Sequence, residues 1–342
     1  GWSDGNRINN NGWVLGRASY SAGMYTVLFH DSVLETIPNG LYGALNDNGT
    51  VAGASSGHSN LWSSKTGLLT FDSDCDPRAM NNSDIAVGST FGSVPRACVL
   101  DRISGPRDLN DFIAQDSGWI LQRAMAINDA GQIVGTGLHN GILRGFLLTP
   151  MLDLIDLNDD AFRDGNTYTT DTARLSHGGR QIVGLAADGV TPVLLRYRTL
   201  TGPGAVTIEI KDDNDSTTAD SVGTLCLPGS TTACDNPLTV PLVRIPSGDW
   251  MAFAVLTSPI DFGRDELDDD KAERPLSVKL NVQGFGDADH PLLKKDLTLV
   301  RPPVVLMHGI WSEYKTWEWG LVDDNRFSVA RYDYSTTNAA PF

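Results

Sequence analysis

The sequence predicts a mainly β protein in three parts: a repeat-built, β-propeller-like domain over residues 1–200, a β-sandwich over 201–300, and a short strand–turn–helix–strand segment over 301–342. Three observations predict this order. A ten-residue pattern recurs five times in the first part, apolar and polar residues alternate in the second, and an unbroken apolar run leads into a His-Gly turn in the third.

The repeat unit consists of a strand, a polar turn and a returning strand. Its copies are RINNNGWVLG (7–16), ALNDNGTVAG (44–53), AMNNSDIAVG (79–88), AINDAGQIVG (126–135) and a degenerate fifth, LSHGGRQIVG (175–184). An Asx side chain caps such a turn, and a Gly or Asp in it adopts the left-handed backbone, so each copy predicts a β-hairpin. We interpret the recurring Asn, Asp and Gly as turn chemistry and not as a binding site.

Each unit also carries a later apolar stretch, such as YTVLF (25–29) and RGFLL (144–148). The glycines that close the copies are 35 to 49 residues apart, and three or four short strands at this period suit a propeller blade. A β-solenoid is the alternative. The pattern resembles the HAF-type extracellular repeat of exported bacterial proteins over residues 1–200. The resemblance implies export and a β-rich scaffold, and it specifies no ligand.

The repeat stops near Gly202–Pro203–Gly204, which reads as a linker. The stretches that follow alternate in polarity and predict strands of an immunoglobulin-like β-sandwich. They are VTIEI (206–210), LTVPLVRI (238–245), WMAFAVL (250–256) and LSVKLNVQGF (276–285).

Two acidic runs, KDDNDSTTAD (211–220) and RDELDDDKAER (264–274), interrupt these stretches. Calcium favours clustered oxygen ligands, which makes Asp212, Asp213 and Asp215 candidate ligands. The EF-hand template fails, because counting from Asp213 places no Gly at the sixth position and no Glu at the twelfth. Charge runs are otherwise solvated loops. We expect no cofactor besides this calcium candidate.

The four cysteines form two plausible pairs. Cys226 and Cys234 bracket the turn-rich LPGSTTA, and a bridge across so short a loop contributes about 2–3 kcal/mol. Cys75 and Cys98 flank one repeat copy and can bridge its strands. The sequence contains no C-x-x-C motif, and its histidines show no metal-binding spacing. With export, two disulfides indicate an oxidising compartment.

The final segment begins with the apolar run Val304–Met307, which predicts a strand buried in a parallel sheet. A turn at His308–Gly309, a helix over 312–322 and a strand over 327–335 complete the start of a βαβ unit. The segment resembles the N-terminal part of an α/β-hydrolase domain of lipase or esterase type. This resemblance implies that the backbone N–H of Ile310 helps to bind the oxyanion, with Gly309 and Trp311 shaping the turn.

The nucleophile of that family lies in a G-x-S-x-G elbow after the oxyanion strand, and nothing after Trp311 matches it. The upstream GASSG (53–57), centred on Ser55, closes a repeat hairpin, and we interpret it as a coincidence. We therefore expect a catalytically silent, non-catalytic N-terminal part of an exported serine hydrolase that acts on an ester, with the nucleophile beyond the chain end. The alternative is a non-catalytic surface or adhesion protein whose repeats bind a glycan or another protein.

The net charge and the distribution of apolar residues limit the classes of partner further. A net charge of −16 argues against a nucleic acid partner. No apolar run approaches the roughly 18 residues of a transmembrane helix. The chain opens without Met or a signal peptide, so we expect either a removed leader or a truncation, and we expect a truncation at the C-terminal end as well. The expected location is extracellular, periplasmic or at the cell surface, after bacterial-type export.

Overall fold

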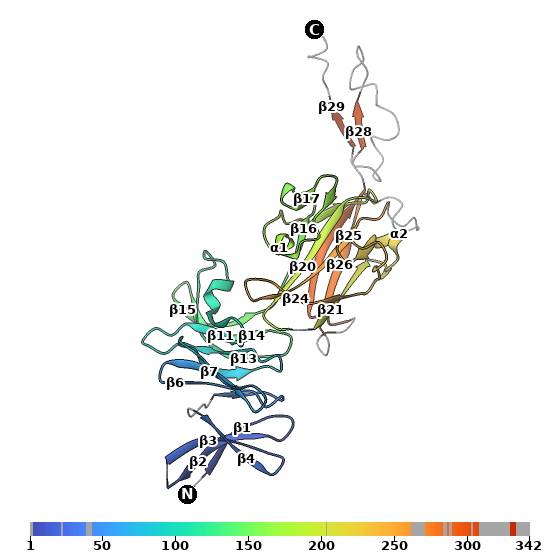
Figure 1. The fold of residues 1–342 in the computed structure, drawn as a ribbon. Coiled ribbons are helices and arrows are strands. Elements are labelled where there is room, and N and C mark those ends of the chain that lie inside the picture. The colour runs from blue at the N-terminus through green and yellow to red at the C-terminus, as the bar shows by residue number, and fades with distance from the viewer. Residues whose placement is uncertain are drawn as a thin grey trace. The chain divides into compact units, whose positions relative to one another are not determined.

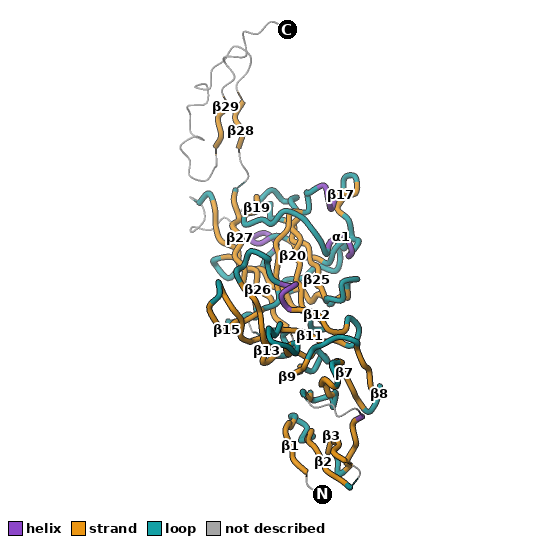
Figure 2. The backbone as a smooth tube through the Cα atoms, turned by 90° about the vertical axis from the view of Figure 1, so that its left-hand side faces the viewer, coloured by secondary structure: helices purple, strands orange, loops and turns teal. Residues whose placement is uncertain are grey.

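A computed structural model of the chain describes residues 3–21, 23–38, 43–202, 204–260, 271–282, 286, 289–301, 304–307 and 329–332. Strands dominate these residues, and the helices among them are short (Figure 2). The chain forms two compact units. The first comprises Gly1–Pro150, Thr199–Pro203 and Pro246–Trp250, and the second comprises Met151–Arg198, Gly204–Ile245 and Met251–Phe342.

The first unit contains four antiparallel sheets, which follow one another in chain order (Figure 1). The first sheet contains β1 (Ser3–Ile8), β2 (Val14–Tyr20), β3 (Gly23–His30) and β4 (Val33–Ile37). The second contains β5 (Ala44–Leu45), β6 (Val51–Ser55), β7 (His58–Ser63) and β8 (Gly67–Phe71). The third contains β9 (Asp76–Met80), β10 (Ala86–Ser89), β11 (Ala97–Asp101) and β12 (Gly105–Asp108). The fourth contains β13 (Trp119–Ile127), β14 (Ile133–His139) and β15 (Ile142–Leu148).

Each of these repeat sheets contains one of the first four copies of the repeat, with the polar turn between its first two strands. Successive strands pair with their chain neighbours, so every sheet is a simple meander. The 3₁₀-helix η2 (Leu109–Phe112) follows the third sheet, and the Asp108 carboxylate caps it by accepting from the backbone N–H of Asn110. Consecutive sheets bury separate apolar cores between them.

The second unit is a sandwich of two sheets. One contains β16 (Met151–Asp156), β20 (Pro192–Thr199), β25 (Trp250–Thr257) and β22 (Thr224–Cys226), with β24 (Val243–Arg244) paired to β25. The other contains β19 (Gly184–Ala186), β27 (Leu293–Val300), β26 (Glu273–Val282), β21 (Ala205–Asp212) and β23 (Leu238–Pro241). Alternating residues of both sheets form one shared core, as the period-two pattern predicts.

The sheet that contains β16, β20 and β25 is buried on its other face too. Residues between β16 and β20 supply this cover with η3 (Asp160–Phe162), β17 (Arg163–Asp164), β18 (Thr167–Tyr168) and α1 (Thr172–Leu175). Phe162 and Leu175 pack there against Ile155 and Phe253. Another helix, α2 (Ala219–Val222), follows β21.

The prediction of a mainly β chain with antiparallel sheets is confirmed. The division of the chain differs from the predicted boundary at residue 200, because β16 pairs with β20 and β20 pairs with β25. Residues 151–198 therefore belong to the second unit. The degenerate fifth copy lies there as well, where its closing Gly184 begins β19, a strand parallel to β27.

The described residues of the final segment include two strands. β28 (Val304–Met307) pairs in parallel with β29 (Val329–Tyr332), and Val304 lies opposite Val329. Both fall where the sequence predicts strands, and a parallel pair is the pairing that a βαβ unit contains. The connection between them, residues 308–328, lies outside the described residues.

Candidate functional site

The turn of each repeat is organised by its first asparagine. In the second repeat the Oδ1 atom of Asn46 accepts hydrogen bonds from the backbone N–H groups of Asn48 and Thr50, at 3.1 and 2.9 Å. In the third repeat Asn81 does the same for Ser83 and Ile85, at 3.1 and 3.0 Å. This is the Asx-turn chemistry that the sequence predicts.

The same asparagines also join one repeat to the next. Their Nδ2 atoms donate to the backbone carbonyl of the equivalent asparagine in the following repeat. The donations run from Asn9 to Asn46 at 2.9 Å, from Asn46 to Asn81 at 3.0 Å and from Asn81 to Asn128 at 3.2 Å. These four residues form an asparagine ladder, which passes through all four repeat sheets in one direction.

The second turn position adds a parallel line of contacts, in which amides alternate with carboxylates. Asn10 donates to both carboxylate oxygens of Asp47, from its backbone N–H at 2.8 Å and from its side chain at 2.9 Å. Asn82 does the same to Asp129, at 2.6 and 2.9 Å. The backbone hydrogen bond from Asn10, followed by that from its side chain, lowers the pKa of Asp47 below its ordinary value.

The sequence interpretation as turn chemistry covers only the acceptor half of this arrangement. The overlooked signal is that the first position is always Asn in the first four copies, although Asp also caps such turns. An amide, unlike a carboxylate, offers an acceptor to its own turn and a donor to its neighbour. The fifth copy has Ser176 at this position, and the ladder ends at Asn128.

Ser55 and His58 form the closing pair of the hairpin between β6 and β7. Ser56 and Gly57 between them have φ values of 54° and 82°, as a two-residue hairpin turn requires. A nucleophile elbow needs a strand followed by a helix. The G-x-S-x-G match therefore lies in a strand–turn–strand context, and His58 contacts the exposed Asp72 at 3.3 Å.

The three calcium candidates lie at the end of β21 (Asp212) and directly after it (Asp213 and Asp215), and each is paired with a different cation. The pairs are Asp212 with Arg274 at 3.4 Å, Asp213 with Lys271 at 3.4 Å and Asp215 with Lys211 at 3.8 Å. Asp212 and Arg274 are both buried. Among the described residues, no three His, Cys, Asp or Glu side chains lie close enough together to hold a metal ion. Most of the second acidic run lies outside the described residues.

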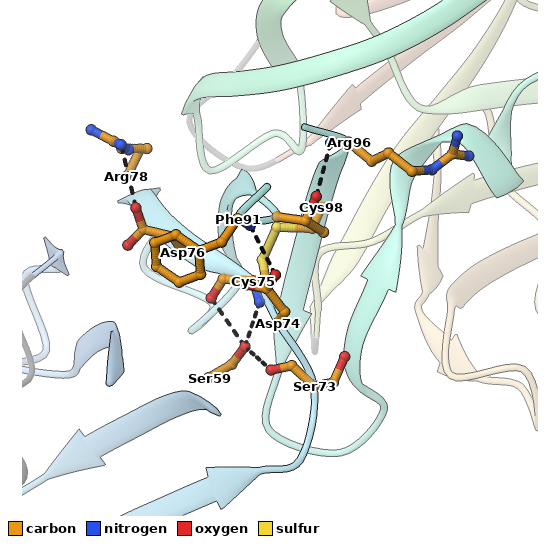
Figure 3. Close-up of a disulfide and its surroundings, with 10 residues drawn as sticks. Ser59, Ser73, Asp74, Cys75, Asp76, Arg78, Phe91, Arg96 and Cys98 are labelled. Atoms are coloured by element: carbon orange, nitrogen blue, oxygen red, sulfur yellow. Dashed lines mark hydrogen bonds and ion pairs between the residues drawn. A yellow bond between two sulfur atoms is a disulfide. The ribbon is translucent and has the colours of Figure 1, made fainter. Parts of the chain in front are cut away.

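Both predicted disulfides are formed, Cys75–Cys98 in the first unit and Cys226–Cys234 in the second. Cys75 and Cys98 are fully buried in the core between the second and third repeat sheets. Figure 3 shows how Ser59 fixes this site: its hydroxyl donates to the Ser73 carbonyl at 2.6 Å, lies 3.0 Å from the Cys75 carbonyl, and accepts from the Cys75 N–H at 2.8 Å. The bridge thus lies beside a contact between two repeat sheets.

Replacing Cys75 and Cys98 together by Ala should lower the free energy of unfolding of the first unit by about 3 kcal/mol, because the unfolded chain gains entropy. Hydrogen exchange followed by mass spectrometry measures the loss unit by unit. The matched control replaces Cys226 and Cys234 by Ala and should destabilise the second unit, by about 2.5 kcal/mol. An unchanged exchange rate in the first unit without Cys75–Cys98 would contradict this expectation.

The proposed oxyanion-hole residues Gly309, Ile310 and Trp311, and His308 of the His-Gly motif, lie outside the described residues, immediately after β28 in the sequence. Of this site, the structure describes the two strands on either side, β28 and β29. No helix in the described part of the chain is long and apolar enough to cross a membrane.

No protein-family model matches the chain, and no curated protein matches it significantly.

Proposed function

We propose that this chain is the non-catalytic N-terminal part of an exported serine α/β-hydrolase that cleaves an ester. In this proposal the first unit is a propeller-like repeat scaffold, and the sandwich is an immunoglobulin-like module. Residues 301–342 are the first strands of the catalytic domain, and the backbone N–H of Ile310 is one donor of its oxyanion hole. The nucleophile belongs to sequence that follows Phe342.

The parallel pairing of β28 with β29 carries this proposal. A parallel pair requires a crossover connection, most often a helix, and the 308–328 segment contains the helix-like SEYKTWEWGLV. In the sequence, His308 and Gly309 directly follow β28, a parallel strand that ends at Met307. Active sites of open α/β sheets lie at this end of the strands.

Ester hydrolysis by two forms of the protein tests the proposal. This chain should hydrolyse an activated ester such as p-nitrophenyl butyrate no faster than buffer does. The form extended by the coding sequence downstream should hydrolyse it, and a serine-trapping phosphonate should stop the reaction. Turnover by this chain alone that the phosphonate abolishes would sink the proposal.

In the extended form, Ile310→Pro removes the backbone N–H and should lower kcat about 10²- to 10³-fold, the usual cost of losing one oxyanion donor. Ile310→Ala keeps that N–H and is the matched control, with kcat expected within a few-fold of the parent. Equal losses in the two variants would assign Ile310 a packing role instead.

The second candidate, a surface binding protein built on the repeats, is favoured by one observation. The outer face of the first repeat sheet presents an uncovered apolar row of Ile8, Val14, Phe29 and Leu34.

A further inference from the structure

Each repeat sheet has two cross-strand rows of side chains on opposite faces, because neighbouring residues of a strand point to opposite sides. We name them from the second sheet. Its front row is Leu45, Val51, Trp62 and Leu68, and its back row is Ala52, Leu61 and Leu69. The front row contains the residue just before the turn asparagine, so the equivalent row can be identified in every repeat.

At all three interfaces between repeat sheets, a front row packs on the back row of the preceding sheet. The front row of the second sheet packs on Leu15 and Leu28 of the first. In the third sheet the front row includes Met80, Ala86 and Leu100, which pack on the back row of the second. In the fourth it is Ile127, Ile133 and Leu148, which pack on Val87 and Val99 of the third.

In the described part of the chain, no repeat sheet covers the front row of the first sheet. It consists of Ile8, Val14, Phe29 and Leu34, with Ile8 72%, Phe29 47% and Leu34 49% exposed. The next row on this face, Gly5, Gly16, Val27 and Thr36, is also uncharged, but Gly16 and Val27 are buried, so the exposed apolar patch is the front row itself. Exposed apolar patches commonly mark interfaces.

The opposite end of the array presents an uncovered back row. In the fourth sheet this row is Ala126, Val134 and Leu147, with Val134 43% and Leu147 58% exposed. The array therefore begins with an open front row and ends with an open back row, and these are the two surfaces that pack together at every internal interface.

The asparagine ladder has the same polarity. The carbonyl oxygens of Asn46, Asn81 and Asn128 each accept one hydrogen bond from their own turn and one from the preceding asparagine. Among the described residues, no asparagine precedes Asn9 in the ladder, and its carbonyl accepts from Gly12 of its own turn at 3.1 Å. A preceding repeat would place an amide donor at this carbonyl.

We propose that two copies of this chain associate head to tail. The front row of the first repeat sheet in one copy binds the back row of the fourth repeat sheet in the other, and Asn128 of that copy donates to the Asn9 carbonyl. The contact continues the three interfaces within the chain. It is heterologous, so each added copy leaves one open front row and one open back row, and assembly proceeds beyond the dimer.

Sedimentation velocity over a wide concentration range tests this association. The parent chain should form species larger than a dimer of its 36.8 kDa monomer, growing with concentration. Phe29→Glu and Leu147→Glu should each remain monomeric. Met24→Glu is the matched control: Met24 shares β3 with Phe29, lies in a different cross-strand row and is 59% exposed, and its variant should assemble like the parent.

Mixing the two monomeric variants distinguishes the head-to-tail contact from other contacts. Phe29→Glu retains an intact back row and Leu147→Glu an intact front row, so the mixture should form a 1:1 heterodimer and stop there. Assembly of Leu147→Glu alone would instead indicate pairing between two first sheets and overturn the proposal. A parent chain that stays monomeric at every concentration would overturn it too. Circular dichroism of each variant verifies that its β content is retained.

Discussion

Replacing Asn46 by Asp should lower the free energy of unfolding of the first unit by about 3 kcal/mol. The new carboxylate still accepts the hydrogen bonds of its own turn. It cannot donate to the Asn81 carbonyl at 3.0 Å or to the Asp84 carboxylate at 2.7 Å, which Asn46 does from a buried position. A carboxylate would face two acceptors instead.

Urea denaturation compares this variant with Asn128→Asp. Asn128 has the same turn role, but its Nδ2 bonds to Gln132 within its own turn at 2.8 Å, so Asn128→Asp should cost under about 1 kcal/mol. Adding Asp84→Asn to Asn46→Asp restores a donor opposite the carboxylate and should recover part of the loss. Equal destabilisation by the two single substitutions would show that the ladder adds nothing to the turns.

Replacing Arg196 by Met should destabilise the second unit by about 3–5 kcal/mol, because it leaves the buried carboxylate of Asp153 without its cationic partner. Arg196 contacts Asp153 at 3.0 Å through Nη2, and its Nη1 donates to the carbonyls of Leu175 and Gly178 at 3.2 and 3.1 Å. Without the guanidinium, Gln181 is the donor that still reaches Asp153, at 2.9 Å. Thermal and urea unfolding monitored in the second unit measure the loss.

A second substitution separates the cost of an unpaired buried charge from the cost of lost side-chain packing. Arg196→Met combined with Asp153→Leu removes both charges, and the double variant should regain most of the lost stability. The control is Arg174→Met, which breaks an exposed ion pair with Asp164 and should cost under about 1 kcal/mol. A double variant less stable than Arg196→Met would contradict the argument.

Much of the fold could be predicted from local patterns. The turn motif located the first two strands in each of four repeat sheets, and the cysteine spacing gave both bridges. The limits of the units could not be predicted this way. They depend on long-range pairing, such as β19 with β27 and β20 with β25, and local polarity does not specify the partner of a strand.

For the candidate sites too, local patterns predict some features, and others depend on contacts between distant parts of the chain. GASSG has the letters of a catalytic elbow, and only the pairing of Ser55 with His58 shows that it closes a hairpin. The asparagine ladder was missed because a turn explains each asparagine when one copy is considered alone. Comparing the copies with one another, at the first turn position, would have revealed the donor that each of the first three repeats offers the next repeat.

The one-after-another packing of the repeat sheets has a consequence for how the first unit loses structure. A middle sheet packs against a neighbour on both faces, whereas the first and fourth sheets each pack against one, so local opening is least costly at the two ends of the array. Heat, a protease or a pulling force should then remove structure from the ends of the array inward, one sheet at a time.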